Sequence, residues 1–102
     1  MATDPVWTSR AETDLLELYA RLEDADEGRG ERLLHEIESC LRLLCLMPEM
    51  APIYEAPFRR MLLRERRHGL YYTPEDRGVV VHAICDLTQD HETTLRHLGI
   101  RR

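Results

Sequence analysis

Five arginines lie within nine positions of an otherwise acidic chain, and their side chains are the clearest candidates for a binding site. A guanidinium group is planar and always charged, and it can hold a phosphate or a carboxylate through two parallel hydrogen bonds. We therefore predict that this segment binds an anionic partner. The alternative is that the charges protect an exposed strand edge from aggregation. The five residues are Arg59, Arg60, Arg64, Arg66 and Arg67.

A second group of side chains could transfer protons. His82 and Asp86 are four positions apart on a predicted strand, so they are expected to share a face. Tyr72 lies on the neighbouring predicted strand, and the three are candidates for an acid–base site. The alternative, which we favour, is a hydrogen-bonded polar patch, because titratable groups also form purely structural networks.

Metal and cofactor chemistry is not predicted. The histidines and the acid near the carboxyl end lack the close two-ligand spacing of known metal motifs. The three cysteines are odd in number and form no CxxC pair, which argues against a disulfide scaffold and suits a reducing cytoplasm. These residues are His91, Glu92 and His97, and Cys40, Cys45 and Cys85.

Length and charge give the broad class. The 102 residues predict a single domain over 1–102, and no apolar run approaches the roughly 20 residues of a membrane span. The amino-terminal segment does not resemble a secretory signal, so we predict a cytoplasmic protein. The net charge of −5 is uneven, because residues 1–57 hold 13 acids and 5 arginines, and residues 58–102 hold 6 acids and 9 arginines.

The positively charged part of the chain predicts three consecutive strands, Phe58–Arg66, His68–Thr73 and Val79–Leu87. Period-two alternation places the odd positions of the last strand, from Val79 to Leu87, on one buried face. Tyr71 and Tyr72 must point to opposite faces, one into the core and one into a groove, and the sequence does not say which.

Two amphipathic helices are predicted before these strands. Apolar residues at helical spacing predict helices over 10–23 and 31–47, separated by a polar loop over 24–30. Ser9 has Glu12 three positions later, which is the spacing of a capping box. The predicted core comprises Leu15, Tyr19, Ile37, Leu41, Leu44, Val79, Val81, Ala83 and Cys85.

The remaining segments complete an α+β order. Pro5–Thr8 is a short predicted strand, and the three prolines of Pro48–Pro57 predict an irregular connector. Asp90 is a predicted N-cap for a short carboxyl-terminal helix through Leu98. The expected fold is β-α-α-β-β-β, with a helical hairpin packed on a mostly antiparallel sheet and a short C-terminal helix.

Three stretches in this order resemble the RelE/ParE toxin superfamily, also called plasmid-stabilisation proteins. They are VWTSRAETDLLELY at Val6–Tyr19, MPEM at Met47–Met50 and RRHGLYYTPEDRGVVVHAICDLTQD at Arg66–Asp90. The resemblance implies a RelE/ParE-like fold and the toxin of a bacterial type II toxin–antitoxin system. It implies a cognate antitoxin as partner and leaves a homodimer possible.

The resemblance implies three alternative activities. The ParE branch inhibits DNA gyrase by binding, and we favour this branch. The RelE branch cleaves messenger RNA on the ribosome, and a third alternative is an interaction module that has lost toxicity. RNA cleavage needs positive charge on the phosphate, whereas Asp86 and Asp90 stand where that charge is required. We therefore predict no cleavage of naked RNA. The half of the chain from Phe58 onward is net positive, so we also predict that the antitoxin lies across the sheet side of the molecule near the arginines.

Overall fold

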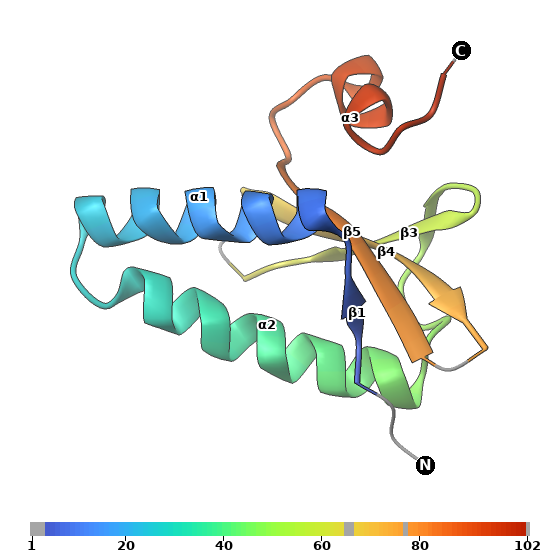
Figure 1. The fold of residues 1–102 in the computed structure, drawn as a ribbon, viewed down its shortest axis with the longest axis horizontal. Coiled ribbons are helices and arrows are strands. Elements are labelled where there is room, and N and C mark those ends of the chain that lie inside the picture. Colours follow the sequence, from blue (N-terminus) through green and yellow to red (C-terminus); the bar gives the residue numbers. More distant parts are fainter. Residues whose placement is uncertain (1–3, 65–66, 77, 102) are drawn as a thin grey trace.

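The computed structural model describes residues 4–64, 67–76 and 78–101. Five strands form one sheet in the order β1-β5-β4-β3-β2, in which β1 runs parallel to β5 and every other pair is antiparallel. The α+β arrangement with an N-terminal helical hairpin and a short C-terminal helix is confirmed (Figure 1). The elements are β1 (Val6–Trp7), α1 (Ser9–Ala25), α2 (Arg29–Leu46), β2 (Ile53–Glu55), β3 (Phe58–Leu62), β4 (His68–Glu75), β5 (Gly78–Asp86) and α3 (His91–His97).

The core lies between the helical hairpin and one face of the sheet, here called the helix face. Apolar side chains at helical spacing on α1 and α2 are buried there, because burial of apolar surface is the main force that docks an amphipathic helix. The sheet contributes large side chains from β4 and β5. The most buried members are Ala11, Leu33, Ile37, Leu44, Ala51, Leu63, Leu70, Tyr72, Val79 and Val81.

The start of α1 differs from the prediction by one residue. Thr8, rather than Ser9, is the N-cap, and its hydroxyl accepts a hydrogen bond from the Ala11 N–H at 3.1 Å. Thr8 has extended backbone angles because its N–H still pairs with the Val81 carbonyl of β5. The expected Ser9 capping box is therefore wrong, and Ser9 is the first helical residue.

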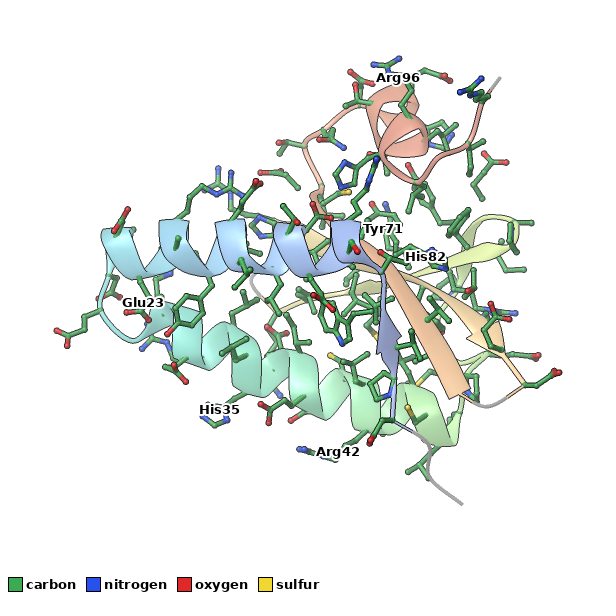
Figure 2. The ribbon with its side chains drawn as sticks, viewed as in Figure 1. Glu23, His35, Arg42, Tyr71, His82 and Arg96 are labelled. Carbon is green, nitrogen blue, oxygen red and sulfur yellow. The ribbon has the colours of Figure 1, made fainter. Side chains whose placement is uncertain are left out.

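The loop between the helices is shorter than predicted. The Glu23 carboxylate accepts hydrogen bonds from the backbone N–H groups of Gly28 and Gly30, at 3.2 and 2.9 Å. A carboxylate at a helix N-terminus satisfies amides that have no partner within the helix, so α2 begins at Arg29. Glu23 lies at this turn in Figure 2. Gly30 is also needed for packing, because a Cβ there would lie 2.8 Å from the Tyr19 ring.

The proline-rich connector contains a strand, so the prediction of wholly irregular structure is wrong. Ile53 pairs with Arg59 and Glu55 pairs with Phe58, which makes β2 an edge strand beside β3. Pro52 and Pro57 flank β2 rather than interrupt it, and prolines are tolerated at sheet edges.

A β-bulge in β5 changes which side chains share a face. Tyr71 pairs with Ala83 and Tyr72 pairs with Val81, so His82 is the extra residue. Beyond it the alternation is reversed, because Ile84 packs on the helix face while Ala83 and Cys85 pack on the opposite, outer face. The predicted single buried face from Val79 to Leu87 is therefore wrong, although Val79, Val81, Ala83 and Cys85 are all buried.

Most of the predicted core is confirmed. Leu15 and Tyr19 are only half-buried, and the Tyr19 hydroxyl donates to the Glu31 carboxylate at 2.8 Å near the surface. Tyr71 and Tyr72 do point to opposite faces, but both are buried, since Tyr71 packs beneath Tyr54 on the outer face. The confirmed residues are Ile37, Leu41, Leu44, Val79, Val81, Ala83 and Cys85.

Helix α3 is attached to the body at both ends. His91, its first residue, is hydrogen-bonded to the Tyr54 hydroxyl through Nδ1 at 2.6 Å. His97, its last residue, contacts both carboxylate oxygens of Asp14 at 3.0 and 2.8 Å. Asp14 also accepts from the Ile84 N–H of β5 at 3.0 Å, so one carboxylate joins α1, β5 and α3.

The three cysteines are expected to react at very different rates. Cys85 is 5% exposed, and burial, with a smaller effect from the charge of Asp14, raises its thiol pKa to about 12. At pH 8 its thiolate fraction is then on the order of one in ten thousand. We expect an aromatic disulfide reagent to modify only Cys40 and Cys45 in the native protein, and all three thiols in denaturant. Equal reaction of all three native thiols would contradict the burial of Cys85.

Candidate functional site

The three candidate catalytic side chains do not come together. The Tyr72 ring is buried on the helix face, and its hydroxyl donates to the Pro48 carbonyl at 2.7 Å. His82 lies among outer-face residues, where Nε2 is 2.9 Å from the Thr73 hydroxyl and its ring packs edge-on against Phe58. Burial lowers the pKa of His82, which favours the neutral imidazole at neutral pH.

Asp86 takes part in a separate turn. Its carboxylate accepts from the Thr88 N–H at 2.8 Å and from the Thr88 hydroxyl at 2.6 Å. These hydrogen bonds lower the pKa of Asp86, so the group is ionised at neutral pH. The bulge at His82 shifts the alternation by one residue, so the expectation that His82 and Asp86 share a face is wrong. Each candidate has a local structural partner instead.

A different set of polar side chains does meet, on the outer face beside the edge strand. The Tyr54 hydroxyl is bonded to His91 Nδ1, and His91 Nε2 lies 3.4 Å from Glu55 Oε1. The Arg60 guanidinium carbon lies 4.8 Å from the centre of the Tyr54 ring, a cation–π geometry. The sequence did not predict this tyrosine–histidine–glutamate cluster, because Tyr54 and Glu55 lie on β2, a strand within the segment that was predicted to be an irregular connector.

The arginine-rich segment divides between the two faces of the sheet. The Arg59 guanidinium donates to the backbone carbonyls of Glu49 and Ala51, at 3.0 and 2.7 Å, and so fixes the connector to β3. Arg60 lies on the opposite face against Tyr54. Arg66 is outside the described residues. Among the described arginines of this segment, Arg59 and Arg60 therefore use their guanidinium groups in contacts within the chain.

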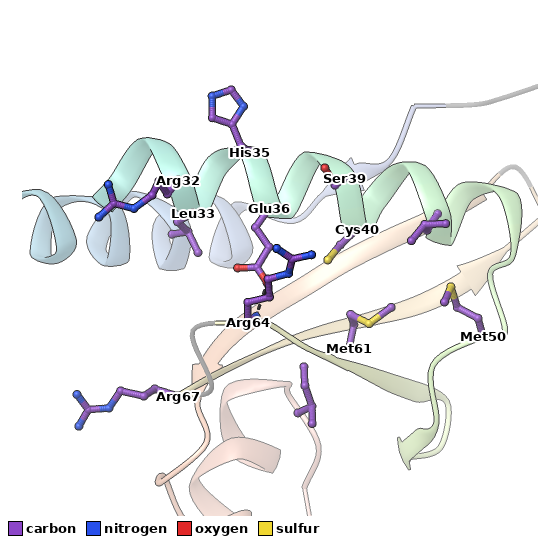
Figure 3. A pocket seen from close by; sticks show the side chains of 12 residues that line it. Arg32, Leu33, His35, Glu36, Ser39, Cys40, Met50, Met61, Arg64 and Arg67 are labelled. Atoms are coloured by element: carbon purple, nitrogen blue, oxygen red, sulfur yellow. Dashed lines mark hydrogen bonds between the residues drawn. The ribbon is translucent and has the colours of Figure 1, made fainter. Parts of the chain in front are cut away.

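Arg64 and Arg67 instead line a groove between α2 and β3, here called the arginine groove. It encloses about 910 Å³, and Figure 3 shows Glu36 and Cys40 of α2 directed toward it. The Glu36 carboxylate accepts a hydrogen bond from the Arg64 backbone N–H, the dashed line in that view. The groove is lined by Arg32, Leu33, His35, Glu36, Ser39, Cys40, Leu43, Met50, Met61, Leu62, Arg64 and Arg67.

The arginine groove is apolar along its length and basic at one end. Leu43 and Leu62 are 48% and 56% exposed, so both add apolar surface to the groove. Within the described residues β2 pairs only with Phe58 and Arg59 of β3, so the edge of β3 near Leu62 has no neighbouring strand. Apolar surface, positive charge and an open strand edge together suit an acidic peptide segment that docks in extended or helical form.

Two further properties concern the described residues only. No three His, Cys, Asp or Glu side chains within 4–64, 67–76 and 78–101 are grouped so that they could hold a metal ion. No helix in this part of the chain is long and apolar enough to cross a membrane.

Comparison with known proteins identifies the family. Residues 6–90 match the family model for the ParE toxin of the parDE type II toxin–antitoxin system. The fold is similar to a solved structure described as the chromosomal ParDE TA system from P. aeruginosa, with a TM-score of 0.69 and 16% identity. The similarity covers 83% of this chain and 96% of that one. A search of curated proteins found no match. The chain therefore belongs to the ParE toxin family of type II toxin–antitoxin systems.

Proposed function

We propose that this toxin inhibits DNA gyrase by binding it in the cytoplasm, and that a cognate antitoxin neutralises the toxin. The observation that carries the proposal is the separation of Tyr72, His82 and Asp86. RNA cleavage needs a base, an acid and positive charge within reach of one phosphate. These three side chains lie on different faces or in a turn, whereas inhibition by binding requires no such arrangement.

The antitoxin is proposed to occupy the arginine groove. An antitoxin tail that orders on binding loses conformational entropy, so it must bury apolar surface to form a stable complex. Leu43, Met61 and Leu62 supply that surface, and Arg64 and Arg67 attract acidic side chains. Of the arginines predicted to bind a partner, the proposed antitoxin site uses Arg64 and Arg67 but not Arg59 and Arg60, because the last two have side-chain contacts within the toxin itself.

The tyrosine–histidine–glutamate cluster favours one second candidate, a ribosome-dependent endonuclease. Glu55 orients the His91 ring, His91 can take a proton from Tyr54, and Arg60 supplies a cation beside them. The binding activity remains the first proposal, because a chain with net charge −5 is repelled by the RNA backbone.

A paired assay distinguishes the two activities. Purified toxin is added to gyrase with relaxed plasmid, and in parallel to translating ribosomes with a defined messenger RNA. We expect loss of supercoiling that an equimolar amount of antitoxin restores, and intact messenger RNA. The His91→Ala variant should still inhibit gyrase. Uninhibited gyrase together with RNA cleavage that disappears in His91→Ala would replace the proposed function with the endonuclease.

A further inference from the structure

A second groove lies on the opposite flank of α2, between that helix, the start of α1 and β1. We call it the Trp7 groove. It encloses about 580 Å³ and is strongly apolar. Residues four apart on a helix share a face, which is why Leu34, Leu41 and Cys45 line this groove while Glu36 and Cys40 line the arginine groove. Its lining is Asp4, Pro5, Trp7, Leu15, Leu34, Ile37, Glu38, Leu41, Arg42, Cys45 and Leu46.

The Trp7 groove is open to a partner. Leu46 at its end is 73% exposed, and Val6, next to its Pro5 and Trp7, is 58% exposed. Trp7, Leu15 and Cys45 are only partly buried against the core. Contiguous apolar surface of this kind marks interaction sites on soluble proteins.

The two grooves differ in charge. The Trp7 groove has two acids, Asp4 and Glu38, and one base, Arg42, among its lining residues. The arginine groove has three arginines and one acid. Every lining residue of the Trp7 groove lies within residues 1–57, which hold 13 acids and 5 arginines, so this groove disfavours an acidic segment and a second copy of the same acidic face.

We propose that the Trp7 groove binds an amphipathic helix with a basic polar face, supplied by a partner other than the antitoxin. Leu34 to Leu46 spans about 18 Å along α2, which matches about three turns of a docked helix. The inference rests on the proposed function in one respect, namely that the toxin acts by binding a target. Because the grooves lie on opposite flanks of α2, the basic helix and the antitoxin bind at the same time.

The chain carries its own reporters for the two grooves. Trp7 is the single tryptophan, and it lines the Trp7 groove. Cys45 lines the same groove, whereas Cys40 lines the arginine groove. Burial raises the pKa of both thiols, so they react slowly with an alkylating reagent at mildly alkaline pH. A ligand that occupies a groove should slow the alkylation of the cysteine in that groove further.

The probe is a synthetic helical peptide of about 12 residues. It has leucines at positions i, i+3, i+4 and i+7, lysines elsewhere, and no tryptophan or cysteine. We expect it to change Trp7 fluorescence and to protect Cys45 but not Cys40, with the antitoxin bound or absent. The same peptide with glutamate in place of lysine should bind at least about tenfold more weakly. Equal binding of both peptides, or protection of Cys40 alone, would overturn the proposal.

Charge reversal at the groove gives a matched control. Glu38→Lys should weaken the lysine peptide about tenfold, whereas Glu27→Lys, on the exposed turn between the helices, should leave its affinity unchanged. Equal effects of the two variants would show that only net charge matters and would reject the site. Two other results would also reject it: Cys45 protection by the antitoxin, or by the toxin alone as its concentration rises.

The gyrase assay separates this inference from the proposed function. If the lysine peptide binds as expected while gyrase is not inhibited, the docking site stands and the gyrase proposal fails. If gyrase is inhibited while the lysine peptide does not bind, the toxin activity stands and the docking site is rejected.

Discussion

Replacing both Arg64 and Arg67 with glutamate is expected to weaken the toxin–antitoxin complex by at least about 30-fold at low salt, because repulsion replaces attraction at two positions. Both side chains are exposed and line the arginine groove, so the substitutions should leave the fold intact. Titration calorimetry at two salt concentrations measures the affinity. The loss should shrink at the higher salt, because exposed charges are screened beyond about 10 Å at 0.1 M.

A second double variant separates location from net charge. Arg21→Glu with Arg101→Glu changes the net charge by the same amount, and both positions are exposed outside the arginine groove. We expect its antitoxin affinity to stay within about threefold of the parent protein, since distant rim charges contribute little. If this control loses as much affinity as Arg64→Glu with Arg67→Glu, the antitoxin does not bind the arginine groove.

The Leu44→Ala substitution should have the largest effect on stability. Leu44 is 0% exposed and belongs to the cluster that joins α2 to the sheet. Truncation removes buried methyl groups and leaves a cavity, which costs about 2–5 kcal/mol in the free energy of unfolding. A chain of this length has about 5–15 kcal/mol in total, so a large part of the stability would be lost.

Leu46→Ala is the matched control on the same helix. Leu46 is 73% exposed, so its truncation should change the free energy of unfolding by no more than about 0.5 kcal/mol. Urea denaturation followed by circular dichroism measures both variants, and the denaturant slope should stay constant. Similar losses for the two leucines would mean that α2 is rotated relative to the arrangement described above.

The local patterns of the sequence were sufficient for the helices and for most of the strands. The apolar spacing in 10–23 and 31–47 places both helices to within two residues at each end, because an amphipathic stripe is a local property. The helix cap and the edge strand were harder to predict from the sequence. Thr8 replaced Ser9 as the cap because its backbone is held by Val81 of β5, a contact 73 positions along the chain.

The candidate site shows the same division. The clustering of arginines is visible in the sequence, but successive side chains of a strand point to opposite faces. Arg59 therefore binds backbone carbonyls on one face, while Arg60 packs against Tyr54 on the other. Only tertiary contacts show that Arg59 is committed to backbone carbonyls while Arg64 and Arg67 line a groove.

The sequence by itself determined the α+β order of elements, the acidic and basic halves and the resemblance to a toxin superfamily, because each depends on composition or short-range pattern. The tertiary structure decided which residues meet. One extra residue at His82 moves Ala83 and Cys85 to the outer face and separates His82 from Asp86. His91 meets Tyr54 and Glu55 across more than thirty positions, and such contacts depend on strand pairing that local periodicity does not specify.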